Sequence, residues 1–212
     1  MTSVGIIGGT GPQGRGLATR WAAAQVSISV GSRDAERAKQ VANEIGNGVR
    51  GLDNVTCAAV SDIVVIAVPW EGHEPTLREL EPSLRDKIVV DSVNPLGFDD
   101  RGPYALAVPE GSAAEQAAQL LPRSRVTAAF HHVSAVSLGD LSVDHLDLDV
   151  LVLGDDREAA KQVVDLANLL PGVRGFHAGR LRNAHQVEAL TANLIAVNRR
   201  YKVHAGLRLT DI

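Results

Sequence analysis

The glycine-rich segment GGTGPQG at residues 8–14 constrains the fold of this chain most strongly. It directly follows the apolar run Val4–Ile7 and precedes a helical pattern over residues 15–25. The segment matches the Gly-x-Gly-x-x-Gly fingerprint in the strand–turn–helix context that gives this motif its meaning. It therefore predicts a βαβ unit in which the N-terminus of a helix faces a pyrophosphate. A glycine-rich turn without a ligand is the alternative, and the flanking strand and helix disfavour it.

Each glycine of this fingerprint has its own expected task. Gly9 permits the tight turn, Gly11 lets the backbone approach the pyrophosphate, and Gly14 lets the helix pack closely on the strand. These tasks require a missing side chain at each position, and they belong to a dinucleotide-binding site.

The end of the next expected strand, Val26–Val30, indicates which dinucleotide is bound. Gly31-Ser32-Arg33 follows it, where an NAD enzyme would place an acidic residue on the ribose hydroxyls. A hydroxyl and a guanidinium would instead bind a 2′-phosphate through charge-assisted hydrogen bonds. Arg37 lies one helical turn after Arg33 and can reach the same phosphate. We therefore predict NADP rather than NAD.

Two alternatives remain at this strand end. Asp34 is either the ribose acid displaced by a few positions or the N-cap of a helix over Ala35–Ile45, and we favour the N-cap. Arg33 and Arg37 are either phosphate ligands or ordinary surface charges.

Alternation of strands and helices predicts an α/β fold, a doubly wound parallel sheet of the Rossmann type with a smaller C-terminal α/β part. The β-branched run Ile63–Val68 is typical of a central strand buried on both faces. We expect an NADP-binding Rossmann domain at residues 1–143 and a small C-terminal domain at residues 144–212 that closes the substrate cleft. Residues 97–103 read as a polar loop.

Composition narrows the classes of function. The net charge is −4 and no basic face is evident, which argues against nucleic acid as a partner. The single cysteine, Cys57, excludes an internal disulfide and indicates a reducing compartment. No apolar run is long enough to span a membrane, so we expect a cytoplasmic protein. The histidines have no metal-ligand spacing, and we expect no metal site.

Several segments should meet at the carboxyl ends of the strands, where open parallel sheets bind ligands. These are Val68-Pro69-Trp70, Asn94 and the segment His131–Ala135. Trp70 either walls a flat ligand or packs over its own loop. The chain has neither a Tyr-x-x-x-Lys pair nor a Gly-x-Ser-x-Gly elbow, so we name no catalytic residue and treat His131 as a candidate orienting group.

Four segments together resemble a known family, the NADPH-dependent deazaflavin reductases, or F420H2:NADP oxidoreductases. They are Ile6–Gly14, Gly31-Ser32-Arg33, Val68-Pro69-Trp70-Glu71 and Leu153-Gly154-Asp155-Asp156, and the similarity extends through Val187–Thr191. The glycine loop is widespread, whereas Gly-Ser-Arg and Val-Pro-Trp-Glu are more specific. His132-Val133-Ser134 departs from the Thr-Ile-Pro of archaeal members, which weakens any role transferred to His132.

The resemblance implies contacts for each part of the cofactor. Thr10, Gly11, Pro12 and Gln13 would hold the pyrophosphate, and Ser32, Arg33 and Arg37 the 2′-phosphate. Along the rest of NADP, the contacts would come from Val68, Trp70, Gly72, Asn94 and Ala135.

The function that the resemblance implies is reversible direct hydride transfer between NADP(H) and the deazaflavin coenzyme F420. Such a transfer depends mainly on positioning two rings, which explains why no proton-transfer pair is evident. Two alternatives stay open: an NADPH-dependent reductase of another acceptor (a flavin, a metal chelate or an imine), and a non-catalytic module that senses the NADP redox state. We also expect a homo-oligomer.

Overall fold

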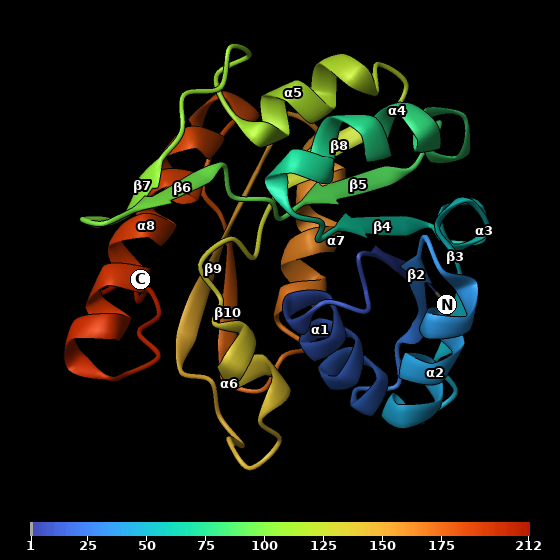
Figure 1. The fold of residues 1–212 in the computed structure, drawn as a ribbon, viewed down its shortest axis with the longest axis horizontal. Helices are drawn as coiled ribbons and strands as arrows, with labels where there is room; N and C mark the ends of the chain where they lie inside the picture. Colours follow the sequence, from blue (N-terminus) through green and yellow to red (C-terminus); the bar gives the residue numbers. More distant parts are fainter. Residues whose placement is uncertain (1) are drawn as a thin grey trace.

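The computed structural model describes residues 2–212, which fold into an α/β structure (Figure 1). The strands are β1 (Ser3–Ile7), β2 (Ser27–Ser32), β3 (Arg50–Asp53), β4 (Ile63–Ile66), β5 (Ile88–Asp91), β6 (Leu96–Asp99), β7 (Gly102–Ala105), β8 (Arg125–Ala128), β9 (Leu148–Gly154) and β10 (Val173–His177). The α-helices are α1 (Pro12–Ala23), α2 (Ala35–Ile45), α3 (Asn54–Ala59), α4 (His73–Leu84), α5 (Ala113–Leu120), α6 (Ala135–Gly139), α7 (Arg157–Ala167) and α8 (Ala184–Tyr201).

Within residues 2–212 the main sheet has eight strands in the order β10-β9-β8-β5-β4-β1-β2-β3. The strands from β8 to β3 are parallel, and β9 joins β8 in antiparallel register. The order reverses between β1 and β4, as in the doubly wound Rossmann fold, and ligands bind at this kind of reversal. The predicted fold class is confirmed, and the C-terminal α/β part extends the same sheet.

Helices cover both faces of this sheet and create two apolar layers. Leu17 and Trp21 of α1 pack with α7 on one face, while Leu77 and Leu80 of α4 pack with α3 and α5 on the other. Strand β4 lies between the layers and is buried throughout, as its β-branched sequence predicts.

Helix starts follow local capping chemistry. The Asp34 carboxylate accepts hydrogen bonds from the N–H groups of Glu36 and Arg37 at 3.0 and 3.1 Å, so the N-cap interpretation is confirmed. Ser112 caps α5 and Asp156 caps α7 in the same way.

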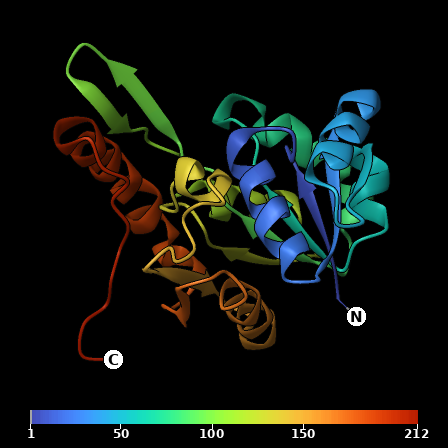
Figure 2. The ribbon, with the colours of Figure 1, turned by 90° about the horizontal axis from the view of Figure 1, so that it is seen from below.

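The expected polar loop at residues 97–103 is wrong, because this segment forms the antiparallel hairpin β6–β7. The hairpin projects beside α8 (Figures 1 and 2). The Asp99 carboxylate accepts hydrogen bonds from the N–H groups of Arg101 and Gly102, and Gly102 has φ +116°, which closes the turn. Much of the hairpin is exposed, so its sequence lacks the apolar alternation that would predict strands.

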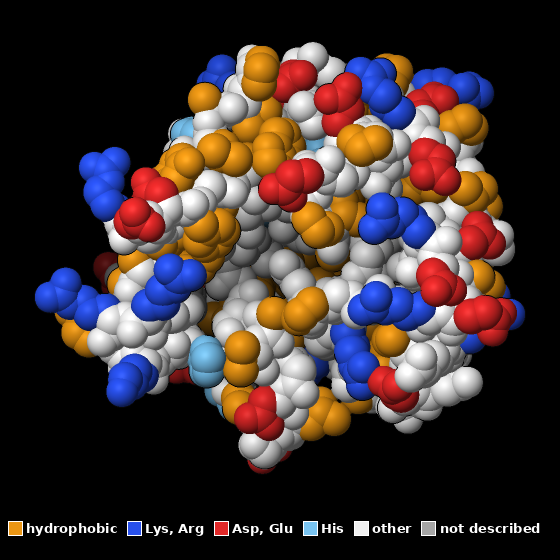
Figure 3. All heavy atoms as spheres, viewed as in Figure 1, with side chains coloured by type: hydrophobic (Ala, Val, Ile, Leu, Met, Phe, Trp, Pro, Cys, Tyr) orange, Lys and Arg blue, Asp and Glu red, His pale blue; other side chains and the backbone are white. Residues whose placement is uncertain are grey.

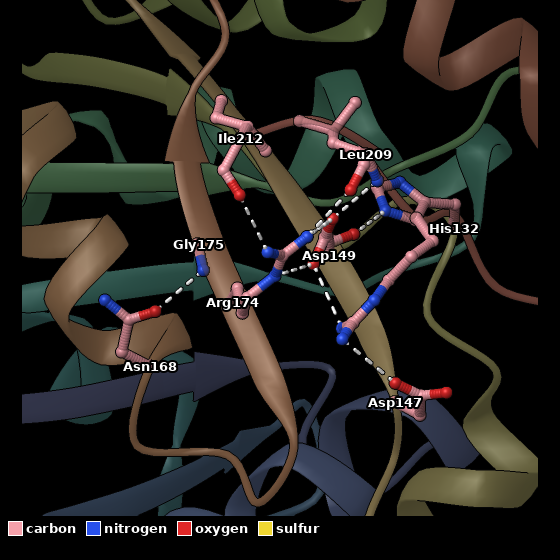
Figure 4. Close-up of polar contacts among 9 residues, drawn as sticks. His132, Asp147, Asp149, Asn168, Arg174, Gly175, Leu209 and Ile212 are labelled. Atoms are coloured by element: carbon pink, nitrogen blue, oxygen red, sulfur yellow. Dashed lines mark hydrogen bonds and ion pairs between the residues drawn. The ribbon is translucent and has the colours of Figure 1, made fainter.

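The C-terminal tail is fastened to the sheet by a charged cluster on β9 (Figure 4). Asp149 is fully buried and receives two hydrogen bonds of 2.7 Å from the guanidinium of Arg174. It also accepts one of 2.6 Å from the N–H of Leu209 in the tail. Hydrogen bonding to Arg174, above all, holds the pKa of Asp149 below its ordinary value.

No helix within residues 2–212 has the length and apolarity needed to cross a membrane. The sheet runs continuously through β8 and β9, across the predicted boundary between residues 143 and 144, and the division into two domains stays a prediction.

Candidate functional site

The glycine loop joins β1 to α1 and leaves the start of the helix uncapped. Gly11 occupies the N-cap position without a side-chain cap, Pro12 begins the helix, and the first turn holds no acidic residue. The free N–H groups and the positive end of the helix dipole are therefore available to an anion, and no carboxylate of the first turn competes for them.

The glycines of the loop differ in which atoms an added side chain would contact. A Cβ on Gly14 would lie 2.8 Å from the Gly8 oxygen and the Gly9 Cα, which fits the close helix–strand packing expected there. A Cβ on Gly11 would meet only the Gly8 oxygen, at 3.3 Å. The left-handed backbone of the loop lies at Gly8, which has φ +80°.

A cavity of about 490 Å³ opens between this loop, the end of β2 and the end of β4. The space-filling view shows a hollow on the same face, with basic side chains to its right (Figure 3). Seven predicted residues line the cavity: Thr10, Gly11, Ser32, Arg33, Arg37, Val68 and Gly72. Among the ion pairs of residues 2–212, none involves Arg33 or Arg37, so both positive charges remain available to a ligand.

The other five predicted residues do not line this cavity. Pro12 and Ala135 line a separate one of about 380 Å³ between α1 and α6. The Gln13 amide donates to the Phe130 carbonyl at 2.9 Å, and the Asn94 amide donates to the His131 carbonyl at 2.9 Å. Trp70 is half-buried, with its ring centroid 5.4 Å from that of His73, which favours packing over its own loop.

The segment after β8 contains a feature that the sequence did not indicate. Phe130 is fully buried with φ +67°, a left-handed conformation that costs a bulky residue roughly 1–2 kcal/mol. The hydrogen bond from Gln13 and an edge-on contact with Trp21, at 5.4 Å between ring centroids, stabilise it. This turn presents the His131 carbonyl to Asn94 and to the hydroxyl of Thr191.

The two histidines that follow are buried and differ in their partners. Neither ring nitrogen of His131 has a hydrogen-bond partner within residues 2–212, and burial lowers its pKa to about 4. His131 is therefore neutral at pH 7. The His132 Nε2 lies 2.8 Å from the Asp149 carbonyl, which is a structural contact, and burial lowers its pKa as well.

A buried polar cluster adjoins the loop at residues 70–72, and no sequence pattern indicated it. His73 Nε2 lies 2.6 Å from Asp91 Oδ2, and His73 Nδ1 lies 2.9 Å from the side-chain oxygen of Gln116. Burial favours neutral His73, but Asp91 and Gln116 outweigh it and raise its pKa. Glu188 of α8 receives the N–H groups of Ala113 and Ala114, and burial raises its pKa to about 7.

This cluster connects two parts of the ligand-facing edge. The ring of His73 packs on Trp70, and the other oxygen of Asp91 accepts the Val93 N–H at 3.0 Å. That bond shapes the turn leading to Asn94. Asp91 therefore sets the position of Asn94 relative to the loop 68–72. Its only sequence signal was a carboxylate closing an apolar strand.

The described residues give no indication of a metal centre. Across residues 2–212, no group of three or more His, Cys, Asp or Glu side chains lies close enough together to hold a metal ion.

The fold and the cavity together define a Rossmann-type dinucleotide-binding protein. A crystal structure of a candidate F420-dependent NADP reductase from Arthrobacter sp. FB24 has the same fold, with a TM-score of 0.85 at 23% identity, covering 99% of this chain and 100% of that one. The family described as "NADP oxidoreductase coenzyme F420-dependent" matches residues 3–95.

Two relatives extend the match over the whole chain. The F420-dependent NADP reductase of Methanothermobacter thermautotrophicus is 38% identical over 100% of this chain and 96% of its own length. The enzyme of the same description from Methanocaldococcus jannaschii is also 38% identical, over 99% of this chain and 98% of its own. The chain belongs to the F420-dependent NADP reductase family, as its sequence motifs predicted.

Proposed function

We propose that this protein catalyses reversible, direct hydride transfer between NADP(H) and the deazaflavin coenzyme F420. The observation that carries the proposal is the pair Arg33 and Arg37, free of ion pairs within residues 2–212, on a cavity that also contains the glycine loop. Full-length relatives described as F420-dependent NADP reductases support the same activity.

The residues present fit NADP. The uncapped start of α1 suits the pyrophosphate. Because Gly11 has no side chain, the backbone there can approach the pyrophosphate closely. Ser32, Arg33 and Arg37 supply one hydroxyl and two positive charges for the 2′-phosphate. When bound, NADPH supplies a hydride from its nicotinamide ring, and coenzyme F420 takes up that hydride together with one proton from water.

The protein contributes positioning to this reaction. Asn94, the His131 carbonyl and Thr191 form a hydrogen-bonded group that joins the β5 and β8 ends to α8. Holding reacting centres in contact supplies much of the acceleration of such a step. His131 is neutral and buried, so we assign it an orienting task and name no catalytic residue.

The activity is tested by mixing the purified protein with NADPH and oxidised F420 and following the loss of deazaflavin absorbance. We expect rapid bleaching with NADPH and little with NADH. NADPH deuterated at the transferred position should deliver its label to F420, and loss of the label to water would exclude direct transfer. Reduction of a flavin, a metal chelate or an imine instead of F420 would establish another acceptor, and absence of any reduction would favour a redox sensor.

The His131→Ala variant tests the positioning mechanism. Because no proton relay depends on this side chain in our proposal, turnover should fall by roughly 100-fold or less. A far larger loss in a variant that still melts cooperatively near the wild-type temperature would make His131 a catalytic residue.

We further propose that residues 144–212 act as a small domain that closes the substrate cleft. We also propose that the protein is cytoplasmic, that it forms a homo-oligomer and that it does not bind nucleic acid. The net charge of −4 supports the last point, and the exposed aromatic side chains of Phe98, Tyr104 and Tyr201 support self-association. Light scattering should then give a mass of at least twice the 22.4 kDa of one chain.

A further inference from the structure

His73 is a fully buried histidine between two residues that line the cofactor cavity. Gly72 and Thr76 line the cavity from the start of α4, whereas the His73 side chain has no exposed surface. Its ring nitrogens lie 2.6 Å from an oxygen of Asp91 and 2.9 Å from the side-chain oxygen of Gln116. His73 therefore joins a wall of the cavity to strand β5 and helix α5.

The start of α4 lacks the usual side-chain cap. Gly72 occupies the N-cap position and makes no side-chain hydrogen bond, and the preceding turn Trp70–Gly72 contains no buried residue. The ring of Trp70 packs on the ring of His73, with 5.4 Å between the centroids. The position of this part of the wall therefore depends on how His73 is held.

Asp91 continues the connection to the other ligand-facing segment. One of its carboxylate oxygens contacts His73, and the other accepts the N–H of Val93 at 3.0 Å. The next residue is Asn94, whose amide donates to the His131 carbonyl at 2.9 Å. The His73–Asp91 contact is thus the point at which the wall at residues 70–72 and the turn before Asn94 are joined.

Stability alone does not explain why this pair is polar. Both side chains have no exposed surface, and apolar side chains of similar volume often stabilise an interior as well as a buried ion pair does. A hydrogen-bonded pair adds direction, because each bond forms only over a narrow range of distance and angle. Such a pair suits a place where the exact position of two segments matters.

We propose that His73 and Asp91 are positioning residues for hydride transfer, because their contact fixes the cavity wall at residues 68–72 relative to Asn94. The inference rests on the proposed function, since it requires hydride transfer between NADP(H) and F420. Displacement of reacting groups by about 1 Å can slow such a step roughly 100-fold. Breaking the contact should therefore slow the chemical step.

Binding of the adenosine half of NADP should not depend on this contact. Arg33 and Arg37 belong to the segment that leads from β2 into α2, and the hydrogen bonds of His73 and Asp91 within residues 2–212 go to other elements. We therefore expect a lower kcat at unchanged affinity for the phosphate-bearing end. A general loss of structure would not produce that separation.

Four variants distinguish the contact from the space that the side chains fill. His73→Asn and Asp91→Ser break it: the Asn amide reaches only as far as Nδ1 and hence Gln116, and Ser is too short to contact residue 73 but still accepts the Val93 N–H. His73→Gln and Asp91→Asn keep it, because a Gln amide reaches the position of Nε2 and an Asn amide can donate to a neutral imidazole. The exposed His204→Asn is the control.

Each breaking variant should lower kcat roughly 10- to 100-fold, and the double breaking variant should be no slower than either one. The keeping variants and the control should stay within about threefold of wild type. Calorimetry with 2′,5′-ADP, which has the adenosine 2′-phosphate but no nicotinamide, should give wild-type affinity and stoichiometry for all of them. Without any ligand, amide hydrogen exchange in the breaking variants should be faster at residues 70–73 and 92–94.

The outcomes separate this inference from the proposed function. Breaking variants that turn over at the wild-type rate would refute positioning by this pair and leave the NADP site intact. A loss of 2′,5′-ADP affinity in proportion to kcat would show that the pair maintains the whole cavity, and the inference would be wrong. If melting shows that His73→Asn is unfolded, Asp91→Ser decides the question. A wild type that does not reduce F420 with NADPH would refute the proposed function, and this inference with it.

Discussion

At the residue scale, Arg33 is the side chain that we propose to determine the choice of NADP over NAD. It lies just beyond β2 on the cavity wall, and the nearest acidic residue in sequence, Asp34, is turned into the start of α2 by its two capping bonds. The charge of Arg33 is therefore not neutralised by that carboxylate and can pair with a phosphate.

Arg33→Ala should raise the KM for NADP roughly tenfold to a hundredfold and leave the KM for NAD nearly unchanged. A charge-assisted hydrogen bond is worth about 1.5–3 kcal/mol, and only NADP carries the phosphate that receives it. Steady-state kinetics with both dinucleotides measure the effect, and Arg78→Ala on the exposed side of α4 is the control. Equal weakening of both dinucleotides would show that the phosphate lies elsewhere.

Gly11→Ala should abolish most NADP binding and leave the melting temperature close to wild type. The added methyl meets only one protein atom, the Gly8 oxygen at 3.3 Å, but it occupies the space expected for the pyrophosphate. Gly14→Ala is the contrasting variant, since its methyl would lie 2.8 Å from two backbone atoms and should lower the melting temperature. Unaltered NADP affinity of Gly11→Ala in calorimetry would remove the pyrophosphate from this loop.

At the scale of the elements, a buried arginine joins α1 to α6. The Arg20 guanidinium donates to the carbonyls of Leu138 at 3.1 Å, Val143 at 2.9 Å, Ser137 at 2.8 Å and Asp140 at 2.7 Å. A short helix such as α6 has little stability of its own, so these bonds hold its C-terminal end and the loop after it in place.

Arg20→Met should lower the melting temperature by roughly 6 °C or more, because it leaves several buried carbonyls without donors. Faster hydrogen exchange should be confined at first to residues 134–143. Arg123→Ala, which removes a surface pair with Asp86, should have almost no effect on either measurement. Unchanged exchange in this segment would mean that other contacts hold α6.

At the scale of the whole molecule, Glu188 links the C-terminal helix to the core of the sheet. Its carboxyl group is buried against the start of α5 and faces Asp91 and His73. Burial raises its pKa from 4.5 to about 7 in the folded chain. An acid whose pKa is raised by folding is favourable below its unfolded pKa, and its stabilisation is lost as the pH rises through the folded value.

Wild-type protein should therefore lose stability between about pH 4.5 and pH 7 through this group, and Glu188→Gln should flatten that dependence. Denaturant unfolding at pH 5, 6, 7 and 8 measures the difference, with the exposed Glu79→Gln as control. His131 acts in the opposite direction, because its pKa is lowered and its contribution is lost as the pH falls from 6.5 toward 4. If the free energy of unfolding of Glu188→Gln depends on pH in the same way as that of wild type, the raised pKa of the buried Glu188 carboxyl is contradicted.

The sequence by itself determined the features that depend on neighbouring residues. The glycine loop, the buried run at β4 and the N-cap Asp34 follow from local sterics, hydrophobic pattern and capping. The use of NADP is predicted from Ser32 and Arg33 for the same reason, since the segment after β2 carries its own charge signal, and membership of the F420-dependent NADP reductase family confirms it.

The tertiary structure alone decided the features whose partners are distant in sequence. His73 and Asp91 are 18 residues apart, Arg20 and its carbonyl partners more than 115, and Ala113 and Glu188 75. The short strands β3 and β10 likewise lie at the edges of the sheet, where pairing with a neighbour stabilises them without an apolar pattern of their own. Buried polar side chains such as His73, Arg20 and Glu188 are stable in the interior only when the complete fold brings their partners to them. No local sequence pattern therefore predicts these contacts.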